Sequence, residues 1–163
     1  MKCKKKWLSV LLTAVLLTAL LPSNALAAGQ EAEWAKDAAD TLNAICGEEA
    51  FSADTAAMTE ATAAETVKKA GWATDISLDD GEIPLTRGKA CEVLSDVFAL
   101  PVPDNMTAIQ YLYQQNIVNG RAAGDLAENN PVTCAEFAVL AFRVLNSVGG
   151  GEGTEEGWLA PGS

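Results

Sequence analysis

The residues best placed to do chemistry are the acidic side chains of one short segment. Asp75, Asp79, Asp80 and Glu82, with Ser77 among them, crowd a stretch rich in Asp and Gly. Hard cations such as Ca²⁺ bind carboxylate oxygens, so this stretch could hold calcium. The regular calcium loop needs Gly at position 6 and Glu at position 12, and neither falls there when the count starts at Asp75. We therefore expect a solvated turn, with an irregular calcium site as the alternative.

Basic residues are scarce enough to be considered one by one. Arg87 follows Thr86 at the expected start of a helix, and Arg121 follows Gly120 in a Gly-rich loop. A guanidinium group can bind a carboxylate through two parallel hydrogen bonds, so both arginines are candidate ligands for an acidic group. For each of them the alternative is simple exposure to solvent. Lys89 is expected to be a solvated helix residue.

Catalysis and bound cofactors have little support. The chain has no histidine, which removes His-based triads, His general bases and His-ligated zinc. It has no Gly-x-Ser-x-Gly elbow and no phosphate loop, and Cys46, Cys91 and Cys134 are too far apart for a zinc pattern. We expect a protein that is not an enzyme and has no cofactor and no metal. The three cysteines are expected to be small core residues, with a disulfide as the alternative.

The first 27 residues have the order of a secretory signal peptide. Four lysines precede an apolar run over residues 7–21, and Ala25-Leu26-Ala27 fits a cleavage site. The run is shorter than the ~20 apolar residues that span a bilayer, so we expect a secreted protein without a membrane span after cleavage. Cleavage would leave seven basic and all 22 acidic residues, a formal charge of −15. That acidity argues against nucleic acid as a partner.

Helical periodicity dominates the rest of the chain. Hydrophobic residues make up 49% of the sequence, and strand patterns are almost absent. Apolar side chains recur at helical spacing in five segments: residues 34–46, residues 56–70, the segment that opens at Thr86, residues 105–117 and about 133–148. The predicted fold class is therefore mainly α, a small helical bundle built from helix-loop-helix repeats.

Some aromatic and aliphatic residues bear on where ligands could bind. Ile45, Tyr113 and Val148 fall on the stripes that we expect to face the core. Trp34 and Trp72 are expected in the core or at its edge. Tyr111 lies off its stripe, which makes it the better candidate for an exposed ring that stacks on a sugar.

Two parts of the chain repeat with an offset of 47 residues. Residues 84–90, Pro-Leu-Thr-Arg-Gly-Lys-Ala, align with residues 131–137, Pro-Val-Thr-Cys-Ala-Glu-Phe. The proline fixes the entering backbone, the aliphatic residue packs beneath the helix, and Thr86 or Thr133 caps it. Thr133 and Glu136 are also expected to form a capping box.

The segment 56–70 has two interpretations within this repeat. In the preferred one it is the first helix of a unit, as residues 105–117 are, because the loop spacings agree. Residues 34–46 would then be half of a third, degraded unit. In the other, Met58-Thr59-Glu60 matches the aliphatic-Thr motif, and residues 34–71 form one short unit.

Residues 108–145 resemble an S-layer homology repeat. They have an Ala-Ile-x-x-Leu helix, an aliphatic-x-Gly turn that ends at Gly120, a Gly-rich loop, and Thr133, Ala135 and Glu136 at a helix start. The resemblance implies a pseudo-threefold bundle. It divides the chain after the signal peptide into an N-terminal helix with a possible partial repeat (28–50), a degenerate repeat (51–100), a second repeat (101–148) and a flexible acidic tail (149–163).

The resemblance also implies a function. Such domains bind secondary cell-wall polysaccharide and hold secreted proteins on Gram-positive surfaces, and their motif arginine helps to bind the acidic groups of the polymer. It implies a non-catalytic cell-surface protein whose partners are a peptidoglycan-associated polysaccharide and other surface proteins. The residues implied as ligand-binding are Thr86, Arg87, Gly120 and Arg121. The alternatives are a degenerate module for protein contacts and a calcium-dependent docking module at residues 75–82.

Overall fold

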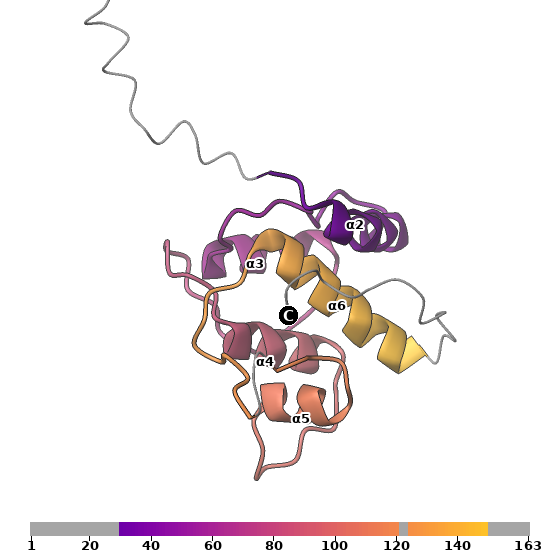
Figure 1. Cartoon of the computed structure of the whole chain (residues 1–163). Coiled ribbons are helices and arrows are strands. Elements are labelled where there is room, and N and C mark those ends of the chain that lie inside the picture. Colours follow the sequence, from indigo (N-terminus) through magenta and orange to yellow (C-terminus); the bar gives the residue numbers. More distant parts are fainter. Residues whose placement is uncertain (1–29, 121–123, 150–163) are drawn as a thin grey trace, which may run out of the picture.

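Five α-helices make up about half of the described part of the chain, which is residues 30–120 and 124–149 of the computed structural model. They are α2 (Glu33–Cys46), α3 (Glu60–Lys69), α4 (Arg87–Val97), α5 (Ala108–Gln114) and α6 (Cys134–Gly149). Helix α6 runs through the middle, with α2 and α3 on one side and α4 and α5 on the other (Figure 1). The predicted mainly α class is confirmed.

Several sequence predictions fall on residues that are not described. The expected signal peptide, Arg121 and the tail beyond Gly149 all lie outside the two described ranges. Within those ranges, every helix is too short or too polar to cross a membrane.

Three short extended segments meet in a closed ring of backbone hydrogen bonds. The amide of Met58 donates to the carbonyl of Val132 (2.9 Å), Val132 donates to Leu85 (3.0 Å), and Leu85 donates back to Met58 (2.8 Å). All three side chains are buried. Each segment therefore gives one bond to one neighbour and takes one from the other, which gives the bundle a pseudo-threefold arrangement.

A second set of bonds joins the same three segments in the opposite direction. The first residue of each of α3, α4 and α6 donates its amide to a carbonyl of the neighbouring segment: Glu60 to Ile83 (2.8 Å), Arg87 to Asn130 (2.8 Å) and Cys134 to Ala56 (3.1 Å). The first amides of a helix have no partner inside it. The extended segments therefore satisfy the helix starts as well as one another.

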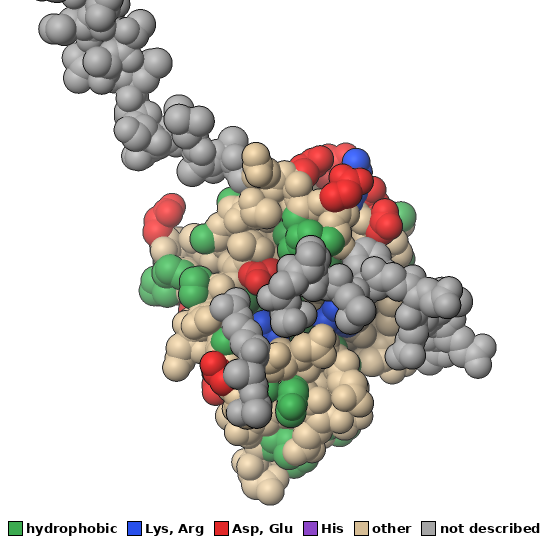
Figure 2. Space-filling model, in the orientation of Figure 1, with side chains coloured by type: hydrophobic (Ala, Val, Ile, Leu, Met, Phe, Trp, Pro, Cys, Tyr) green, Lys and Arg blue, Asp and Glu red, His purple; other side chains and the backbone are tan. Residues whose placement is uncertain are grey.

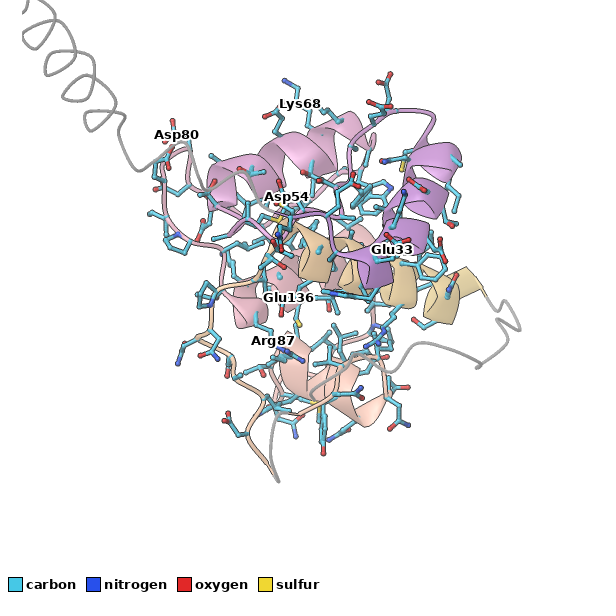
Figure 3. All side chains as sticks on the ribbon, turned by 45° about the horizontal axis from the view of Figure 1, so that its top comes forward. Glu33, Asp54, Lys68, Asp80, Arg87 and Glu136 are labelled. Carbon is cyan, nitrogen blue, oxygen red and sulfur yellow. The ribbon has the colours of Figure 1, made fainter. Side chains whose placement is uncertain are left out.

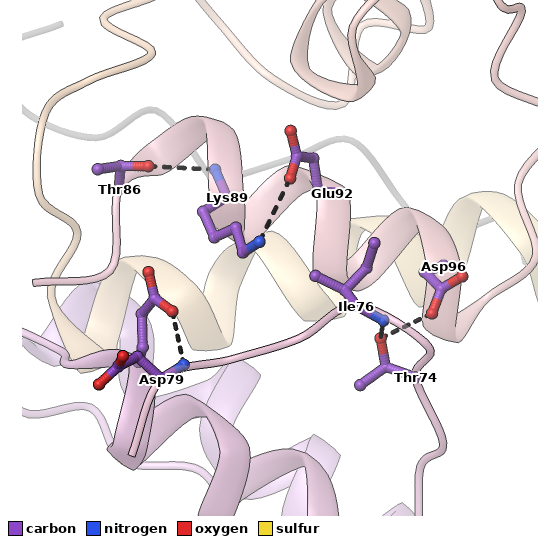
Figure 4. Close-up of polar contacts among 8 residues, drawn as sticks. Thr74, Ile76, Asp79, Thr86, Lys89, Glu92 and Asp96 are labelled. Atoms are coloured by element: carbon purple, nitrogen blue, oxygen red, sulfur yellow. Dashed lines mark hydrogen bonds and ion pairs between the residues drawn. The ribbon is translucent and has the colours of Figure 1, made fainter. Parts of the chain in front are cut away.

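A threonine caps each of these three helices. The side chains of Thr59, Thr86 and Thr133 accept hydrogen bonds from the amides of Thr62 (3.1 Å), Lys89 (3.2 Å; Figure 4) and Glu136 (3.1 Å). The carboxylate of Glu136 in turn accepts from the amide of Thr133 at 2.9 Å. The predicted caps at Thr86 and Thr133, and the capping box, are confirmed.

The position of each helix relative to the ring shows which helices correspond to one another in the three units. Met58-Thr59 occupies the same place in it as Leu85-Thr86 and Val132-Thr133, so α3 corresponds to α4 and α6. This supports the interpretation that joins residues 34–71 in one unit. The preferred alignment of residues 56–70 with 105–117 was wrong, because the residues just before Glu60 are extended and belong to the ring.

Most of the predicted core is buried, but some residues at the helix ends that were predicted to be buried are exposed. Phe137, Leu42, Met58, Leu85 and Leu94 are the largest fully buried side chains. Ile45, Val148 and Tyr113 were expected to face inward, yet they are exposed by 61%, 51% and 44%. Each is the second-last residue of its helix, where the apolar stripe extends beyond the elements that cover it. Trp34, the second residue of α2, is 37% exposed for the same reason.

We predict that removal of a threonine cap weakens the whole fold. Thr133→Ala should lower the free energy of unfolding by about 1 kcal/mol, because the Glu136 amide loses its acceptor. Thr41→Ala is the matched control, since the exposed Thr41 hydroxyl only donates to a carbonyl within α2. Urea unfolding monitored by circular dichroism measures both. Equal stabilities for the two variants would contradict the role of the cap.

Candidate functional site

Arg87 lies at the start of α4, at a contact between two units of the bundle. Its Nη2 donates to the carbonyl of Asn119 at 2.7 Å. Asn119 and Gly120 form the turn that follows α5, whereas Arg87 belongs to the preceding unit. The structure therefore brings Arg87 to the aliphatic-x-Gly turn, residues 117–120. Both features were predicted from the sequence to belong to the site.

A second arginine reaches the same turn from α6. Nη1 of Arg143 donates to the carbonyl of Ile117 at 3.4 Å, and its side chain is half-buried. Burial and, second, the positive charge of Arg87 lower the pKa of Arg143, because both disfavour the charged form of its side chain. Arginine nonetheless stays protonated at any ordinary pH. The site therefore contains two like charges.

The two cations have no acidic partner in the described part of the chain. The ion pairs present there are Lys69–Glu65 at 2.8 Å and Lys89–Glu92 at 3.8 Å, and neither involves an arginine. Each guanidinium carries five N–H donors. Apart from the single bond that each makes to the turn, these donors have no protein acceptor among the described residues.

The other predicted site residues have different positions. The Thr86 hydroxyl serves as the cap of α4. Gly120 ends the turn and is half-buried, so its backbone is next to the Arg87 contact. Lys89 pairs with Glu92 on the same helix (Figure 4), as a partly solvated residue would.

Gly88 follows Arg87 because a larger residue would collide with a neighbour. Its amide donates to the carbonyl of Glu128 at 2.8 Å. The Glu128 side chain occupies the space of a β-carbon, with its Cγ only 2.6 Å from the ideal position. The absence of a side chain at residue 88 thus has a local steric cause. The exposed Glu128 is also an acidic group near the site, although it forms no ion pair with either arginine.

Sequence reasoning missed Arg143. The signal that could have found it is its isolation, because it is the one charged residue between Phe137 and Gly149. A lone charged side chain in the middle of an apolar helix needs a polar group to interact with. Here that group is the carbonyl of Ile117 in the turn at residues 117–120.

The charged surface is uneven around these arginines. Acidic side chains gather over α2, and a few basic side chains lie near the middle of the same face (Figure 2). Figure 3 places Arg87 near the middle of the molecule and Lys68 far from it, on the outer side of α3. An anion approaching the bundle therefore meets a local positive group within an acidic protein.

The arginine position is not repeated in the other two units. The first residue after the capping threonine is Glu60 in α3 and Cys134 in α6. The Glu60 carboxylate accepts a hydrogen bond from the Asp79 amide at 2.8 Å, and Cys134 is half-buried and free. Only the contact between α4 and the turn at residues 117–120 therefore combines this position with a cation.

The predicted exposure of the tyrosines is reversed in the structure. Tyr111 is half-buried and lines an open hollow with Phe98, Leu100 and Ile117, whereas Tyr113 is the exposed ring. Tyr111 packs against the edge of the core, whereas Tyr113 is the second-last residue of α5 and projects beyond it. Trp72 packs edge-on against Phe98, with 5.0 Å between ring centroids, as expected for a residue at the edge of the core.

The acidic stretch is tied down by hydrogen bonds. An Asp79 carboxylate oxygen accepts from the Gly81 amide at 2.7 Å. Across the described residues, no three His, Cys, Asp or Glu side chains are grouped so that they could hold a metal ion. The irregular calcium site stays an untested alternative for this stretch.

The three described cysteines are free thiols. Cys91 is buried, and burial raises its pKa to about 12, so its thiol stays protonated and inert at neutral pH. Cys46 and Cys134 are half-buried, less enclosed than predicted.

Comparison with protein families, curated proteins and solved structures gives no match for this chain.

We predict a pH-dependent contact at the start of the acidic stretch. A hydrogen bond from the Thr74 hydroxyl (2.7 Å), and then one from the Asp75 amide, hold the pKa of the Asp96 carboxyl below its ordinary value (Figure 4). A lowered folded-state pKa stabilises the fold above the unfolded-state value of about 4, and the effect disappears as the pH falls through the folded-state value. Because Asp96 is only half-buried, solvent screens this interaction and the effect should be small.

Asp96→Asn should therefore lower the melting temperature at neutral pH, and the difference from the parent chain should close in acid. Thermal unfolding over this pH range measures it. Asp104→Asn, on an exposed turn, is the control. A difference between Asp96→Asn and the parent that stays constant with pH would show that the carboxylate charge plays no part.

Proposed function

We propose that this chain is a secreted, non-catalytic cell-surface module that binds secondary cell-wall polysaccharide. The observation that carries the proposal is the convergence of Arg87 and Arg143 on the turn at residues 117–120 without an acidic partner among the described residues. Guanidinium groups bind carboxylates and phosphates through paired hydrogen bonds. Acidic groups of a wall polymer are ligands of that chemistry.

The arrangement of the units supports the same proposal. The resemblance to S-layer homology repeats implies a pseudo-threefold bundle, and the backbone ring of Met58, Leu85 and Val132 has that cyclic order. In this arrangement the motif arginine of one unit lies against the turn of the next. Binding at such a contact needs two correctly packed units, so the proposed site depends on the folded bundle rather than on an isolated peptide.

The overall charge shapes how binding should depend on salt. A strongly acidic protein repels an anionic polymer at long range, and salt screens that repulsion at separations beyond the Debye length, which is about 10 Å at 0.1 M. The close contacts with Arg87 are screened less. We therefore expect moderate salt to leave binding intact, unlike the steep loss of affinity that is typical of a cationic surface on a polyanion.

We predict that Arg87→Ala abolishes binding to the wall polymer while the fold survives. The test is sedimentation of the chain, residues 28–163, with purified peptidoglycan that either carries or lacks its covalently attached polysaccharide. The parent chain should sediment only with the polysaccharide-bearing wall. Lys68→Ala is the matched control, because Lys68 is an exposed cation on α3, away from the site (Figure 3).

Circular dichroism must show both variants to be helical, so that lost binding is not lost folding. Retained binding by Arg87→Ala would contradict the assigned site. Absence of binding by the folded parent chain would contradict the proposed function.

A second function is favoured by one observation. Glu60 and Cys134 occupy the positions that are equivalent to Arg87, so two of three equivalent positions lack the cation. This agrees with a degenerate module that serves protein contacts on the cell surface. Such a module would bind neither wall preparation, and it would be indifferent to Arg87→Ala. Calcium-dependent docking through residues 75–82 would instead respond to a chelator and be unaffected by Arg87→Ala.

A further inference from the structure

We propose that Arg143 is a second ligand-binding residue, and that Arg87 and Arg143 together hold one oxyanion, a carboxylate or a phosphate, against the turn at residues 117–120. The identity of the polymer that carries this oxyanion rests on the proposed function. The anion site itself rests only on the two side chains and the turn, and it can be tested without the polymer.

The first argument is distance. Arg87 binds the carbonyl of Asn119 and Arg143 binds that of Ile117. Backbone groups two residues apart are separated by at most about 7 Å. Two side chains fixed to such close carbonyls bring their remaining N–H donors within reach of a single group that has two or more acceptor oxygens.

The second argument is charge. Arg143 is half-buried, and the charge of Arg87 adds to the cost of burial that it already bears. Buried charges are normally paired, and neither arginine has an acidic partner in the described chain. The exposed Glu128, near the start of α4, forms no ion pair with either arginine. A bound oxyanion would supply the missing negative charge.

The third argument separates binding from a structural role. If Arg143 served only to hold the turn, its contact with Ile117 should be short and well made. The contact is 3.4 Å long, at the weak end of hydrogen-bond geometry. The turn is also held without it, because the amides of Ile117 and Val118 both donate to the carbonyl of Leu112. Arg143 is therefore available for another acceptor.

The test is an NMR titration of the chain, residues 28–163, with inorganic phosphate and, separately, with acetate. Sodium chloride keeps the ionic strength constant. We expect saturable shifts of the Arg87 and Arg143 side-chain N–H signals and of the Asn119 and Gly120 amides. The probe that binds with the higher affinity indicates whether the site prefers a phosphate or a carboxylate. Absence of saturable shifts with both probes would overturn the proposal.

Three variants and one control establish which side chains bind the anion. Arg143→Gln and Arg87→Gln should each weaken binding of the probe by about tenfold or more, the loss expected for one charge-assisted hydrogen bond. Arg143→Lys, which keeps the charge, should bind more weakly than the parent chain but more strongly than Arg143→Gln. Lys68→Gln should bind as the parent does. Equal probe affinity in Arg143→Gln and the parent would overturn the role of Arg143.

The readout also separates this inference from the proposed function. If the probe anions bind and the polysaccharide-bearing wall does not, the oxyanion site stands and the proposed polymer is wrong. If the wall binds through Arg87 and Arg143→Gln changes neither assay, the proposed function stands and the paired-arginine site is wrong.

Discussion

The structure depends on one closed ring of backbone hydrogen bonds. Met58, Val132 and Leu85 donate to one another in turn, although they lie in segments up to 74 residues apart. Closing such long loops costs conformational entropy, which the burial of three aliphatic side chains and three capped helix starts offsets. Because each segment contacts both of the others, loss of any one removes two of the three bonds. The ring therefore couples the units into one bundle.

The candidate site is a consequence of that coupling. The ring orients α4 so that Arg87, the first residue after the cap, meets the turn of the next unit, and it places α6 so that Arg143 reaches the same turn. The equivalent position holds Glu60 in α3, where it ties down the acidic stretch through Asp79. The same backbone position thus holds the arginine of the proposed ligand site in one unit and a carboxylate that contacts a loop in another.

Sequence patterns predicted the five helical segments and the caps at Thr86 and Thr133, because periodicity and a capping threonine are local signals. The equivalence of α3 with α4 and α6 was harder to predict from the sequence. It depends on backbone hydrogen bonds between distant segments, and the side-chain pattern that accompanies these bonds in the first segment is only Met58-Thr59. The prediction that side chains are buried was wrong at helix ends such as Ile45 and Val148. There the apolar stripe of the helix continues beyond the elements that pack against it. Arg87 and Gly120 were predicted as site residues because the resemblance to an S-layer homology repeat implies them. Arg143 was missed because its partner is a carbonyl 26 residues away.

Native-state hydrogen exchange of the ring amides tests the central claim most directly. If the ring holds the bundle together, the amides of Met58, Leu85 and Val132 should exchange only when the whole protein unfolds. Their opening free energies should then equal one another and equal that of the buried amide of Ala141 in the middle of α6. If the Leu85 amide exchanges through a local opening, while Ala141 stays protected, then the ring is not the constraint on which the fold depends.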